Sequence, residues 1–530
     1  MSDLSYDVAI IGGGHNGLVC AAYLAKAGKS VIVLEARSVV GGAATTEEFH
    51  PGFRNSLAAY TVSLLNPKVI RDLKLKRFGL KILERKVNNF WPQEKGSLLA
   101  FHTSRERTSG EIAKFSTRDA AELPRYYRDI ETGAGVLRSL LLETPPNVGG
   151  GIMEYLKAAR VGNRFRKLSL EDQQLVLDLF TKSAGEFLEG YFEADAVRAA
   201  FAFDSIVGFY GSPYTPGSAY VLLHHAFGEV NGKKGVWGQP FGGMGAISEA
   251  IAGAARGYGA EIETGCPVAR VLTKGGKAVG VELESKVVVK AKSVAANVGP
   301  RLLFTKMLEA SVVPAAFYRR MKNFACGSGV LRMNVALDQL PEFKCLRGRK
   351  DASDFLTAGI VIGPAMGYLD NAYRDARRHG WSRQPIIEML IPSIQDNSLA
   401  PNGRHVASLF CQQFAYDLPG GKKWHEVRDQ AADLVIDTVE KYAPGFKKSI
   451  LGRQVLSPWD LEQKFGMTRG DIFHGRLSLD QMFSTRPALG YADYRMPVKG
   501  LYLCGAGAHP GGGVTGVPGH NAAREILKDL

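Results

Sequence analysis

The sequence predicts an α/β protein in which a discontinuous Rossmann-type nucleotide-binding domain carries an inserted α+β substrate domain. A glycine-rich turn lies between an apolar run and a helical pattern near the start of the sequence. A second glycine-dense loop, at residues 500–520, follows another apolar run near its end. The length of 530 residues exceeds what one hydrophobic core accommodates, so two or three domains are expected.

The first predicted unit is a strand, a turn and a helix. Residues 8–11 form a short apolar run that suits a buried parallel strand, and residues 18–27 show a helical pattern. The turn between them contains Gly12, Gly14 and Gly17. Such glycines give a tight turn, a close approach of the backbone to a pyrophosphate, and close helix–strand packing. We expect the pyrophosphate at the positive end of this helix, beside His15 and Asn16.

A second predicted strand, residues 31–34, ends in Glu35. Glu35 follows the glycine turn by the sequence separation at which an acid accepts hydrogen bonds from the adenosine ribose hydroxyls. A glycine motif alone is weak evidence for dinucleotide binding. The same motif between a strand and a helix, followed by this acid, is specific evidence for it. A glycine-rich turn without a ligand is the alternative interpretation.

The residues that follow the acid favour FAD over NAD. Ala36 and Arg37 lead to a second glycine pair, Gly41 and Gly42. This arrangement resembles the extended fingerprint of FAD enzymes in the glutathione-reductase-like superfamily, in which the second glycine pair also meets the pyrophosphate. The predicted cofactor is therefore noncovalent FAD in a glutathione-reductase-like domain.

The glycine-dense loop predicts a second part of the cofactor site. Its backbone N–H groups can face the ribityl chain, the nearer phosphate and the carbonyl edge of the flavin without obstruction by side chains. A flexible linker is the alternative, but an apolar flank precedes the loop and a helical pattern, residues 521–530, follows it. The expected cofactor contacts in this loop are Gly505, Gly513, Val514 and Thr515.

Several motifs resemble the phytoene-dehydrogenase-like flavoproteins, a family of carotenoid desaturases, carotenoid isomerases and retinol saturases. The matching segments are residues 14–19, 42–48, 212–225, 242–245 and 500–513. The resemblance covers nearly the whole chain and implies an FAD-dependent oxidoreductase that desaturates, saturates or isomerises a carbon–carbon bond of an apolar, conjugated substrate. In relatives the residue equivalent to Val268 pairs its backbone with adenine, and a simple buried strand residue is the alternative.

Two other classes of protein share this fold. A flavin amine oxidase usually shows a covalent-flavin Cys or an aromatic cage near its C-terminus, and residues 506–510 offer neither. Non-enzymatic proteins of the GDP-dissociation-inhibitor type chaperone prenylated small GTPases and have lost the cofactor. The intact Gly12, Gly14 and Glu35 argue against that second class, and a visible spectrum would separate the classes.

The cofactor-binding pieces are separated in the sequence, so the domains are predicted to be discontinuous. The FAD-binding domain is assigned residues 1–85, 235–314 and 485–530, and the substrate domain is assigned residues 86–234 and 315–484. One long helix is expected over residues 172–191. Strands are expected over residues 268–272, 278–282 and 286–289, with Gly275 and Gly276 as a hairpin turn.

Candidate catalytic and substrate residues come from two segments. His509 is the predicted proton carrier, because it lies in the loop expected beside the isoalloxazine ring and a His titrates near neutral pH. A hydrogen bond to the backbone is the alternative role, and Tyr60, His520 and Asn521 are further candidates. The aromatic run at residues 201–227 favours a pocket for a long apolar molecule or an ordinary core. Its predicted substrate contacts are Phe209 and Tyr210.

Cysteine and histidine positions argue against disulphide and metal chemistry. The six cysteines are scattered and form no C-x-x-C pair, so neither a redox dithiol, a zinc site nor a disulphide scaffold is predicted, and a reducing compartment fits. The adjacent His224 and His225 point in different directions, so no metal site is predicted.

The charge and the N-terminal sequence indicate partners and location. The formal net charge is +14, which attracts anionic partners, and basic clusters lie at residues 68–77, 160–167 and 347–350. Each cluster is interpreted either as a solvated basic face or as a peripheral contact with an anionic membrane that delivers a lipophilic substrate. No nucleic-acid motif is present.

Without a predicted signal peptide, transit peptide or membrane span, a cytoplasmic location is expected. The sequence does not indicate an oligomeric state.

Overall fold

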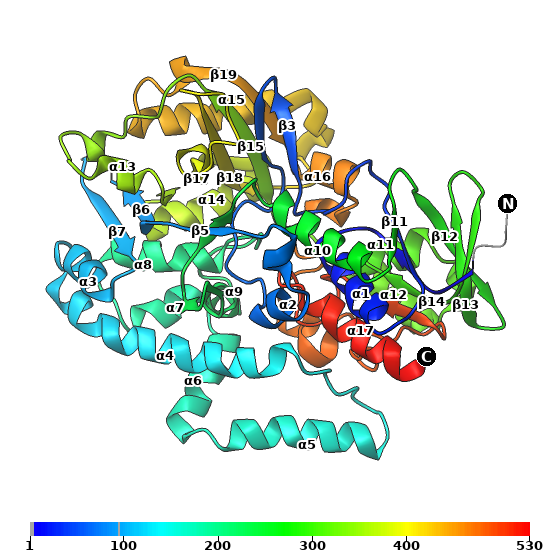
Figure 1. The fold of residues 1–530 in the computed structure, drawn as a ribbon. Coiled ribbons are helices and arrows are strands. Elements are labelled where there is room, and N and C mark those ends of the chain that lie inside the picture. Colours follow the sequence, from blue (N-terminus) through cyan, green and yellow to red (C-terminus); the bar gives the residue numbers. More distant parts are fainter. Residues whose placement is uncertain (1–4, 94–95) are drawn as a thin grey trace.

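The protein is described by a computed structural model that covers residues 5–93 and 96–530. In this part of the chain, two seven-stranded sheets form the cores of two regions, and a group of helices packs beside the second sheet (Figure 1). The predicted α/β class, with a Rossmann-type FAD domain and an α+β substrate domain, is confirmed.

The first sheet is the nucleotide-binding sheet. Its strands are β1 (Ser5–Ile11), β2 (Val31–Leu34), β11 (Glu261–Glu263), β12 (Val268–Lys274), β13 (Lys277–Leu283), β14 (Val288–Ala296) and β20 (Leu501–Leu503). β1 pairs in parallel with β2 and β14, whereas β12 and β13 extend the sheet in antiparallel fashion. Residues 8–11 are fully buried, as their continuous apolar run predicts. Helix α1 (His15–Lys26) packs against α10 (Gly245–Gly257) and α17 (Val517–Asp529).

The predicted start of the first helix and the predicted hairpin turn, both set by glycines, are confirmed. Helix α1 begins at His15 after Gly14, and Gly275 and Gly276 turn the β12–β13 hairpin with φ of 56° and 74°. The single helix expected over residues 172–191 is wrong. The chain forms α6 (Leu170–Thr181) and α7 (Ala184–Glu189), because Ser183 caps a new helix through a capping box with Glu186.

The second sheet carries the core of the other region. Its strands, in spatial order, are β19 (Ile450–Leu456), β15 (Val330–Leu337), β18 (His405–Phe414), β17 (Trp381–Leu390), β16 (Gly359–Ile362), β6 (Val87–Pro92) and β7 (Leu98–His102). Helices α14 (Met366–His379) and α15 (Trp424–Tyr442) pack against β17. The central strand β15 is buried along its whole length.

The strands separate as the domain assignment expects. Every strand of the first sheet comes from residues 1–85, 235–314 or 485–530, and every strand of the second comes from the intervening segments. One hairpin crosses over, since β3 (Thr46–His50) and β4 (Phe53–Ser56) contact β19 and β18 of the second sheet. The domain boundaries themselves stay a prediction.

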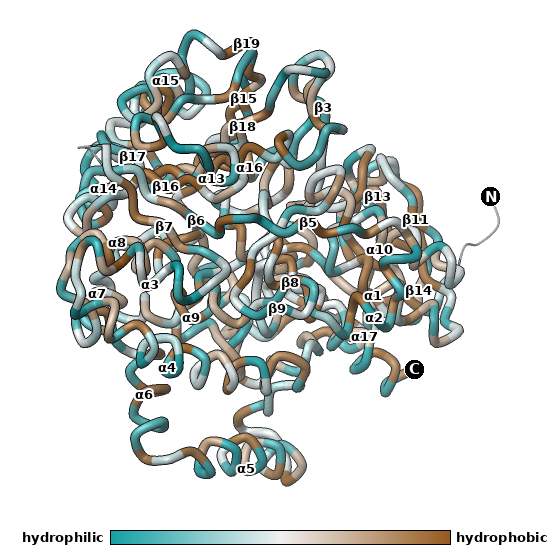
Figure 2. The backbone as a smooth tube through the Cα atoms, turned by 60° about the vertical axis from the view of Figure 1, so that its left-hand side comes forward, coloured by the Kyte–Doolittle hydropathy of each residue, from teal (hydrophilic) through white to brown (hydrophobic). Residues whose placement is uncertain are grey.

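Helices make up most of the inserted segment between β7 and β8. They are α3 (Arg105–Ala113), α4 (Thr117–Leu141), α5 (Ile152–Arg166), α6, α7, α8 (Asp195–Ala202) and α9 (Ser218–Ala226). The remaining short elements are α2 (Pro67–Asp72), β5 (Ile82–Glu84), β8 (Glu229–Val230), β9 (Lys233–Lys234), β10 (Gly238–Pro240), α11 (Pro300–Lys306), α12 (Ala315–Lys322), α13 (Ala352–Phe355) and α16 (Pro458–Phe465). Helix α5 stands apart from the rest (Figures 1 and 2). Across the described residues, no helix has the length and apolar character needed to cross a membrane.

Candidate active site

A cavity of about 540 Å³ lies between the two regions, and we call it the cofactor cavity. One part is lined by residues at the ends of the first sheet's strands, among them Leu34 and Val268. Another part is lined by residues such as Tyr60, Phe410 and Phe473. Its volume is within the range of small-molecule and cofactor sites.

Most of the predicted cofactor residues line this cavity. They are Gly12, Gly14, His15, Asn16, Glu35, Ala36, Arg37, Gly42, Val268, Gly513 and Val514. Four others lie outside the described lining: Gly17, Gly41, Gly505 and Thr515. Two of these shape the turns nearby, since the Gly41 N–H donates to Gly13 O (2.8 Å) and the Thr515 hydroxyl accepts from the Val517 N–H at the start of α17 (3.1 Å). The role of each residue in binding stays a prediction.

The two glycine motifs lie against each other and leave space that side chains would fill. A Cβ on Gly14 would lie 2.7 Å from Asn297 Nδ2, and a Cβ on Gly42 would lie 3.2 Å from Gly14 Cα. A Cβ on Gly17 would lie 2.4 Å from the carbonyl oxygen of Gly12. Gly42 also has a φ of 56°, which side-chain-bearing residues rarely adopt. The geometry therefore fits a pyrophosphate approached by bare backbone.

Glu35 is fixed in the orientation that a ribose contact needs. Its Oε2 accepts from the Gly13 N–H at 2.7 Å, and its Oε1 accepts from the Arg37 N–H at 2.9 Å. Each carboxylate oxygen keeps a further lone pair that can accept from a ribose hydroxyl. The backbone of the glycine turn thus holds the acid for the nucleotide.

Several buried polar atoms along the cavity have no hydrogen-bond partner among the described residues. They are Nδ1 and Nε2 of His15, Oδ1 of Asn16, Nη1 of Arg37 and Nδ1 of His474. Burial and, to a smaller extent, the nearby His474 lower the pKa of His15 to about 4, so the ring is neutral. Unpaired buried polar atoms are costly, and the phosphates and hydroxyls of FAD would supply their partners. No sequence motif marked His474.

A parallel Rossmann sheet, two opposed glycine turns and an acid-tipped second strand, set beside a separate substrate region, define an FAD-dependent oxidoreductase. The family model described as "Flavin containing amine oxidoreductase" matches residues 17–337. A protein from Rattus norvegicus, named pyridine nucleotide-disulfide oxidoreductase domain-containing protein 2, is 40% identical over 550 residues, which cover 99% of this chain and 94% of that protein. The chain belongs to the flavin-containing amine oxidoreductase family, and its cofactor is FAD.

Two further comparisons place the chain within this fold. Phytoene desaturase (lycopene-forming) from Pantoea ananas is 26% identical over 546 residues, covering 98% of this chain and 99% of that enzyme. This match confirms the resemblance to phytoene-dehydrogenase-like flavoproteins. A solved structure of a putrescine oxidase variant aligns with a TM-score of 0.62 at 17% identity, covering 99% of this chain and 100% of the other. At that identity the likeness shows the fold.

A second, smaller space of about 220 Å³ adjoins the cofactor cavity, and we call it the aromatic pocket. Both spaces share Tyr60, Thr61, Val207, His225 and Trp237 in their linings. The remaining aromatic residues of its wall are Trp91, Phe101, Tyr126, Tyr127, Phe201 and Phe203. An apolar molecule held in this pocket would therefore lie next to the cofactor cavity.

The predicted substrate contacts Phe209 and Tyr210 lie outside the described linings of both spaces, and their role in binding a substrate stays a prediction. Phe209 is buried in the helical core, and its carbonyl oxygen accepts from Gln413 Nε2 at 3.1 Å. The Tyr210 ring packs edge-on against Tyr373, with 5.3 Å between centroids. The run of aromatics does line a pocket, but through Phe201 and Phe203, because α8 and the turn after it bring these two rings to the pocket wall.

His509 lies against the backbone at the end of α4, and its role as a proton carrier stays a prediction. It lies outside the described linings of both spaces, and its Nε2 is 3.0 Å from the carbonyl oxygen of Leu140. Burial lowers the pKa of His509 to about 4, so the ring is neutral and fixed. The contact with Leu140 is the hydrogen bond to the backbone that the sequence offered as the alternative role of His509. His520 and Asn521 likewise bond each other, at 2.8 Å.

A buried polar cluster lies where the two spaces meet. The Tyr60 hydroxyl donates to Glu388 on β17, and the guanidinium of Arg332 lies 4.7 Å from the centroid of the Tyr60 ring. Burial raises the pKa of Glu388, while Arg85 and Arg332 lower it. Burial and Glu388 raise the pKa of Tyr60 well above its ordinary value, so its hydroxyl remains a donor.

Asp204 is one of three acids in the described lining of the aromatic pocket, together with Glu131 and Glu388. Burial and, to a smaller extent, the neighbouring Glu388 raise the pKa of Asp204 to about 7. Its carboxylate makes no hydrogen bond to any described residue. The adjacent His225 is neutral, since burial lowers its pKa to about 4, and its Nδ1 contacts Val221 O at 2.8 Å. Asp204 can therefore gain or lose a proton near neutral pH inside the pocket.

The fold brings two of the scattered cysteines together. Cys20 on α1 and Cys504 after β20 are both fully buried, and the contact with Cys504 together with burial raises the pKa of Cys20 well above its ordinary value. All six cysteines lie in the described ranges and are free thiols. A high thiol pKa leaves little reactive thiolate. Among the described residues, no three His, Cys, Asp or Glu side chains lie close enough together to hold a metal.

Replacing all six cysteines by Ala should leave flavin reduction within about twofold of the original rate, because no thiolate faces either space. Anaerobic stopped-flow absorbance measures the rate, and the FAD spectrum reports folding. If the sixfold variant fails to fold, single Cys→Ala variants at each of the six positions test the same point. Turnover of a disulphide substrate that is lost on replacing a single Cys would contradict the expectation.

Proposed function

We propose that this FAD-dependent oxidoreductase desaturates, saturates or isomerises a carbon–carbon bond of an apolar, conjugated substrate. The observation that carries the proposal is the aromatic pocket, whose lining shares five residues with the cofactor cavity. Aromatic side chains offer large apolar area at low entropic cost, which suits a long hydrocarbon. The name of one relative, phytoene desaturase, supports the proposal because phytoene is a hydrocarbon.

The residues of this chain would divide the work as follows. FAD, when bound, supplies the two-electron chemistry that a change at a carbon–carbon bond needs. Asp204 takes up or delivers the proton that accompanies it at the substrate carbon. Tyr60 and Trp237, which line both spaces, orient the substrate and exclude water at the junction. Arg85 and Arg332 act on Glu388 electrostatically and oppose the rise in its pKa that burial causes.

The two rival classes fit the site less well. An amine substrate is a cation at neutral pH, and losing its hydration in a pocket walled mainly by aromatic rings costs free energy that Asp204, whose pKa is raised to about 7, compensates only in part. A chaperone of the GDP-dissociation-inhibitor type needs no cradle for a pyrophosphate. The close glycine spacing around Gly14 and the unpaired ring nitrogens of His15 are explained by a bound pyrophosphate. Without such a ligand, the unpaired nitrogens would only destabilise the fold.

The test is anaerobic reduction of the purified flavoprotein by a panel of substrates. A conjugated polyene in detergent should bleach the flavin absorbance, or be isomerised without net bleaching, and chromatography of the products distinguishes these outcomes. Efficient bleaching by a diamine or a hydroxy acid, with no change in any lipophilic compound, would overturn the proposal. A colourless protein that takes up no FAD would favour the chaperone class.

Phe101→Ala should weaken binding of an apolar substrate on the order of tenfold to a hundredfold, because a buried aromatic side chain contributes about 1.5–3 kcal/mol. Phe101 is half-buried, lines the aromatic pocket and lies 4.7 Å from Phe201 between ring centroids. Substrate titration followed by flavin absorbance measures the affinity. Phe78→Ala, an exposed ring outside both linings, is the matched control and should bind normally. Equal affinity in both variants would argue against this pocket.

A further inference from the structure

Helix α5 stands away from the folded body, and both views show it below the remaining helices (Figures 1 and 2). None of its residues is buried. A surface helix normally turns its apolar residues toward the protein and its polar residues toward water. Helix α5 does the opposite on both of its faces.

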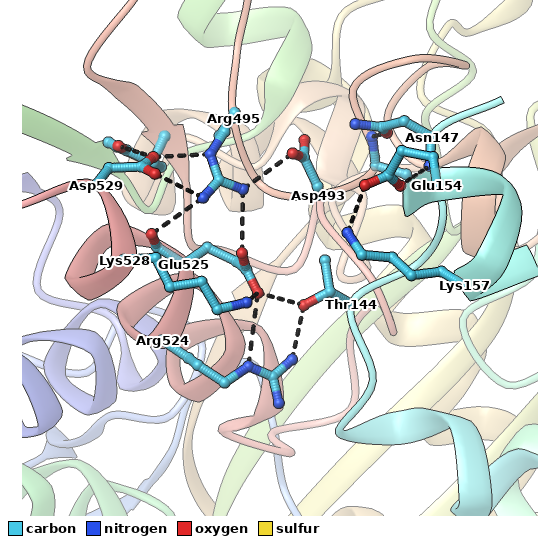
Figure 3. Close-up of polar contacts among 12 residues, drawn as sticks. Thr144, Asn147, Glu154, Lys157, Asp493, Arg495, Arg524, Glu525, Lys528 and Asp529 are labelled. Carbon is cyan, nitrogen blue, oxygen red and sulfur yellow. Dashed lines mark hydrogen bonds and ion pairs between the residues drawn. The ribbon is translucent and has the colours of Figure 1, made fainter. Parts of the chain in front are cut away.

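The face that contacts the protein is polar. Glu154 Oε2 accepts from the Asn147 N–H at 2.7 Å, and Lys157 pairs with the same carboxylate (Figure 3). Arg164 donates to Ser139 O at 2.8 Å and pairs with Glu143 at 2.6 Å. The spacing of residues 154, 157 and 164 places them on one side of the helix. Ion pairs therefore set the orientation of α5.

The outward face is apolar. Ile152 and Tyr155 are 77% and 74% exposed, and Met153 and Leu156 are also exposed. Ile152, Tyr155 and Leu156 lie three and four positions apart, so they form one stripe. The ion pairs and hydrogen bonds of the inner face hold this stripe toward water.

Basic residues flank the stripe. Arg160 follows Leu156 by one helical turn, and Arg166 and Lys167 end the helix, all three exposed. Across residues 5–93 and 96–530, neither Arg160 nor Lys167 has an ion-pair partner, and Arg166 contacts only the side-chain oxygen of Asn163. The positive charges of the inner face, by contrast, are paired.

We propose that α5 docks this protein on an anionic lipid bilayer. A helix that lies in the membrane interface buries an apolar stripe among acyl chains while Lys and Arg meet anionic headgroups, and this is the arrangement that α5 presents. A second copy of the chain is a poor occupant, because it would bring the same unpaired cations face to face. The inference is independent of the substrate.

The position of α5 connects it to the aromatic pocket. Helix α4 lines that pocket through Tyr126 and Tyr127. The segment just after α4 holds α5 through Glu143, and Thr144 in the same segment donates to Glu525 of α17 at 2.6 Å (Figure 3). The docking helix is thus fixed to both regions of the protein.

The test uses the FAD-loaded protein and sucrose-filled vesicles that sediment on centrifugation. The protein should bind vesicles of phosphatidylcholine with phosphatidylserine and bind pure phosphatidylcholine at least about tenfold more weakly. The double variant Ile152→Asp with Leu156→Asp should bind the anionic vesicles at least about tenfold more weakly than the original protein. Arg160→Glu should weaken binding severalfold, and added salt should reduce its effect.

Leu451→Asp is the matched control, because Leu451 is exposed on β19 in the other region; it should bind like the original protein. An unchanged FAD spectrum shows that each variant is folded. The proposal is overturned if the original protein ignores anionic vesicles, or if the double variant binds them equally well. It is also overturned if sedimentation velocity reveals a dimer that the double variant abolishes, since a second copy would then cover this face.

Discussion

Gly14→Val should give a folded but colourless protein that binds FAD at least about a hundredfold more weakly than the original. The new Cβ would lie 2.7 Å from Asn297 Nδ2, and the branched side chain would occupy the space that the pyrophosphate needs. Crowding of this kind costs roughly 1–3 kcal/mol even before the lost phosphate contacts are counted. The ratio of flavin to protein absorbance measures retained cofactor, and titration of the apoprotein with FAD measures the affinity.

Gly135→Val is the control for this experiment. Gly135 is exposed in α4, and a Cβ there would meet no atom within 4 Å. The control protein should be yellow and should melt like the original. Loss of FAD should also lower the melting temperature of Gly14→Val, because a ligand that binds only the native state stabilises it. A yellow Gly14→Val protein with normal affinity would contradict the predicted cofactor position.

Asp204→Asn should slow flavin reduction by the substrate on the order of 10²-fold or more, because an amide cannot accept the proton. In the original protein the oxidation rate should rise with pH and level off above about 7, since the pKa of Asp204 is raised to about 7 and only the carboxylate is a base. The variant should lose this step. Anaerobic stopped-flow rates between pH 6 and pH 9 measure both effects.

Two controls separate chemistry from folding in the Asp204 experiment. Asp433→Asn changes an exposed carboxylate on α15 and should keep the original rate and pH profile. The raised pKa of Asp204 means that the folded protein binds this proton more tightly than the unfolded chain does. The stability that the protonated Asp204 contributes is therefore lost as the pH rises through about 7. An amide does not titrate, so at pH 8 the Asp204→Asn variant should have a melting temperature no lower than that of the original. A normal rate in Asp204→Asn would assign the proton to another group.

The cofactor half of the site could be predicted from the sequence because its chemistry is local. The turn from Gly12 to Gly17 lies between one strand and one helix, and its glycines are dictated by contacts with its own neighbours. Glu35 follows at the end of the next strand and bonds back to the same turn. Each of these features is complete within a short stretch of chain.

The substrate half could not be predicted because long-range packing assembles it. Asp204 follows α8, whereas Glu388, which helps to raise its pKa, lies on β17, and nothing in either local sequence marks the pair. Composition pointed to Phe209, but the chain direction after α8 decides which rings face the pocket. The surroundings of His509 were hidden for a related reason, since the carbonyl oxygen next to its Nε2 belongs to Leu140 on α4.

The walls of the cofactor cavity have a consequence for how the protein is made. Gly12 and Gly14 are translated before the inserted segment, whereas Gly513 and Val514, which line the same cavity, are translated after it. Strand β14 of the nucleotide-binding sheet pairs with the late strand β20 as well as with the early strand β1. Synthesis of the whole inserted segment therefore precedes closure of the site. The flavin can therefore be enclosed only after β20 has been made, and until then the chain carries an open, partly apolar cavity.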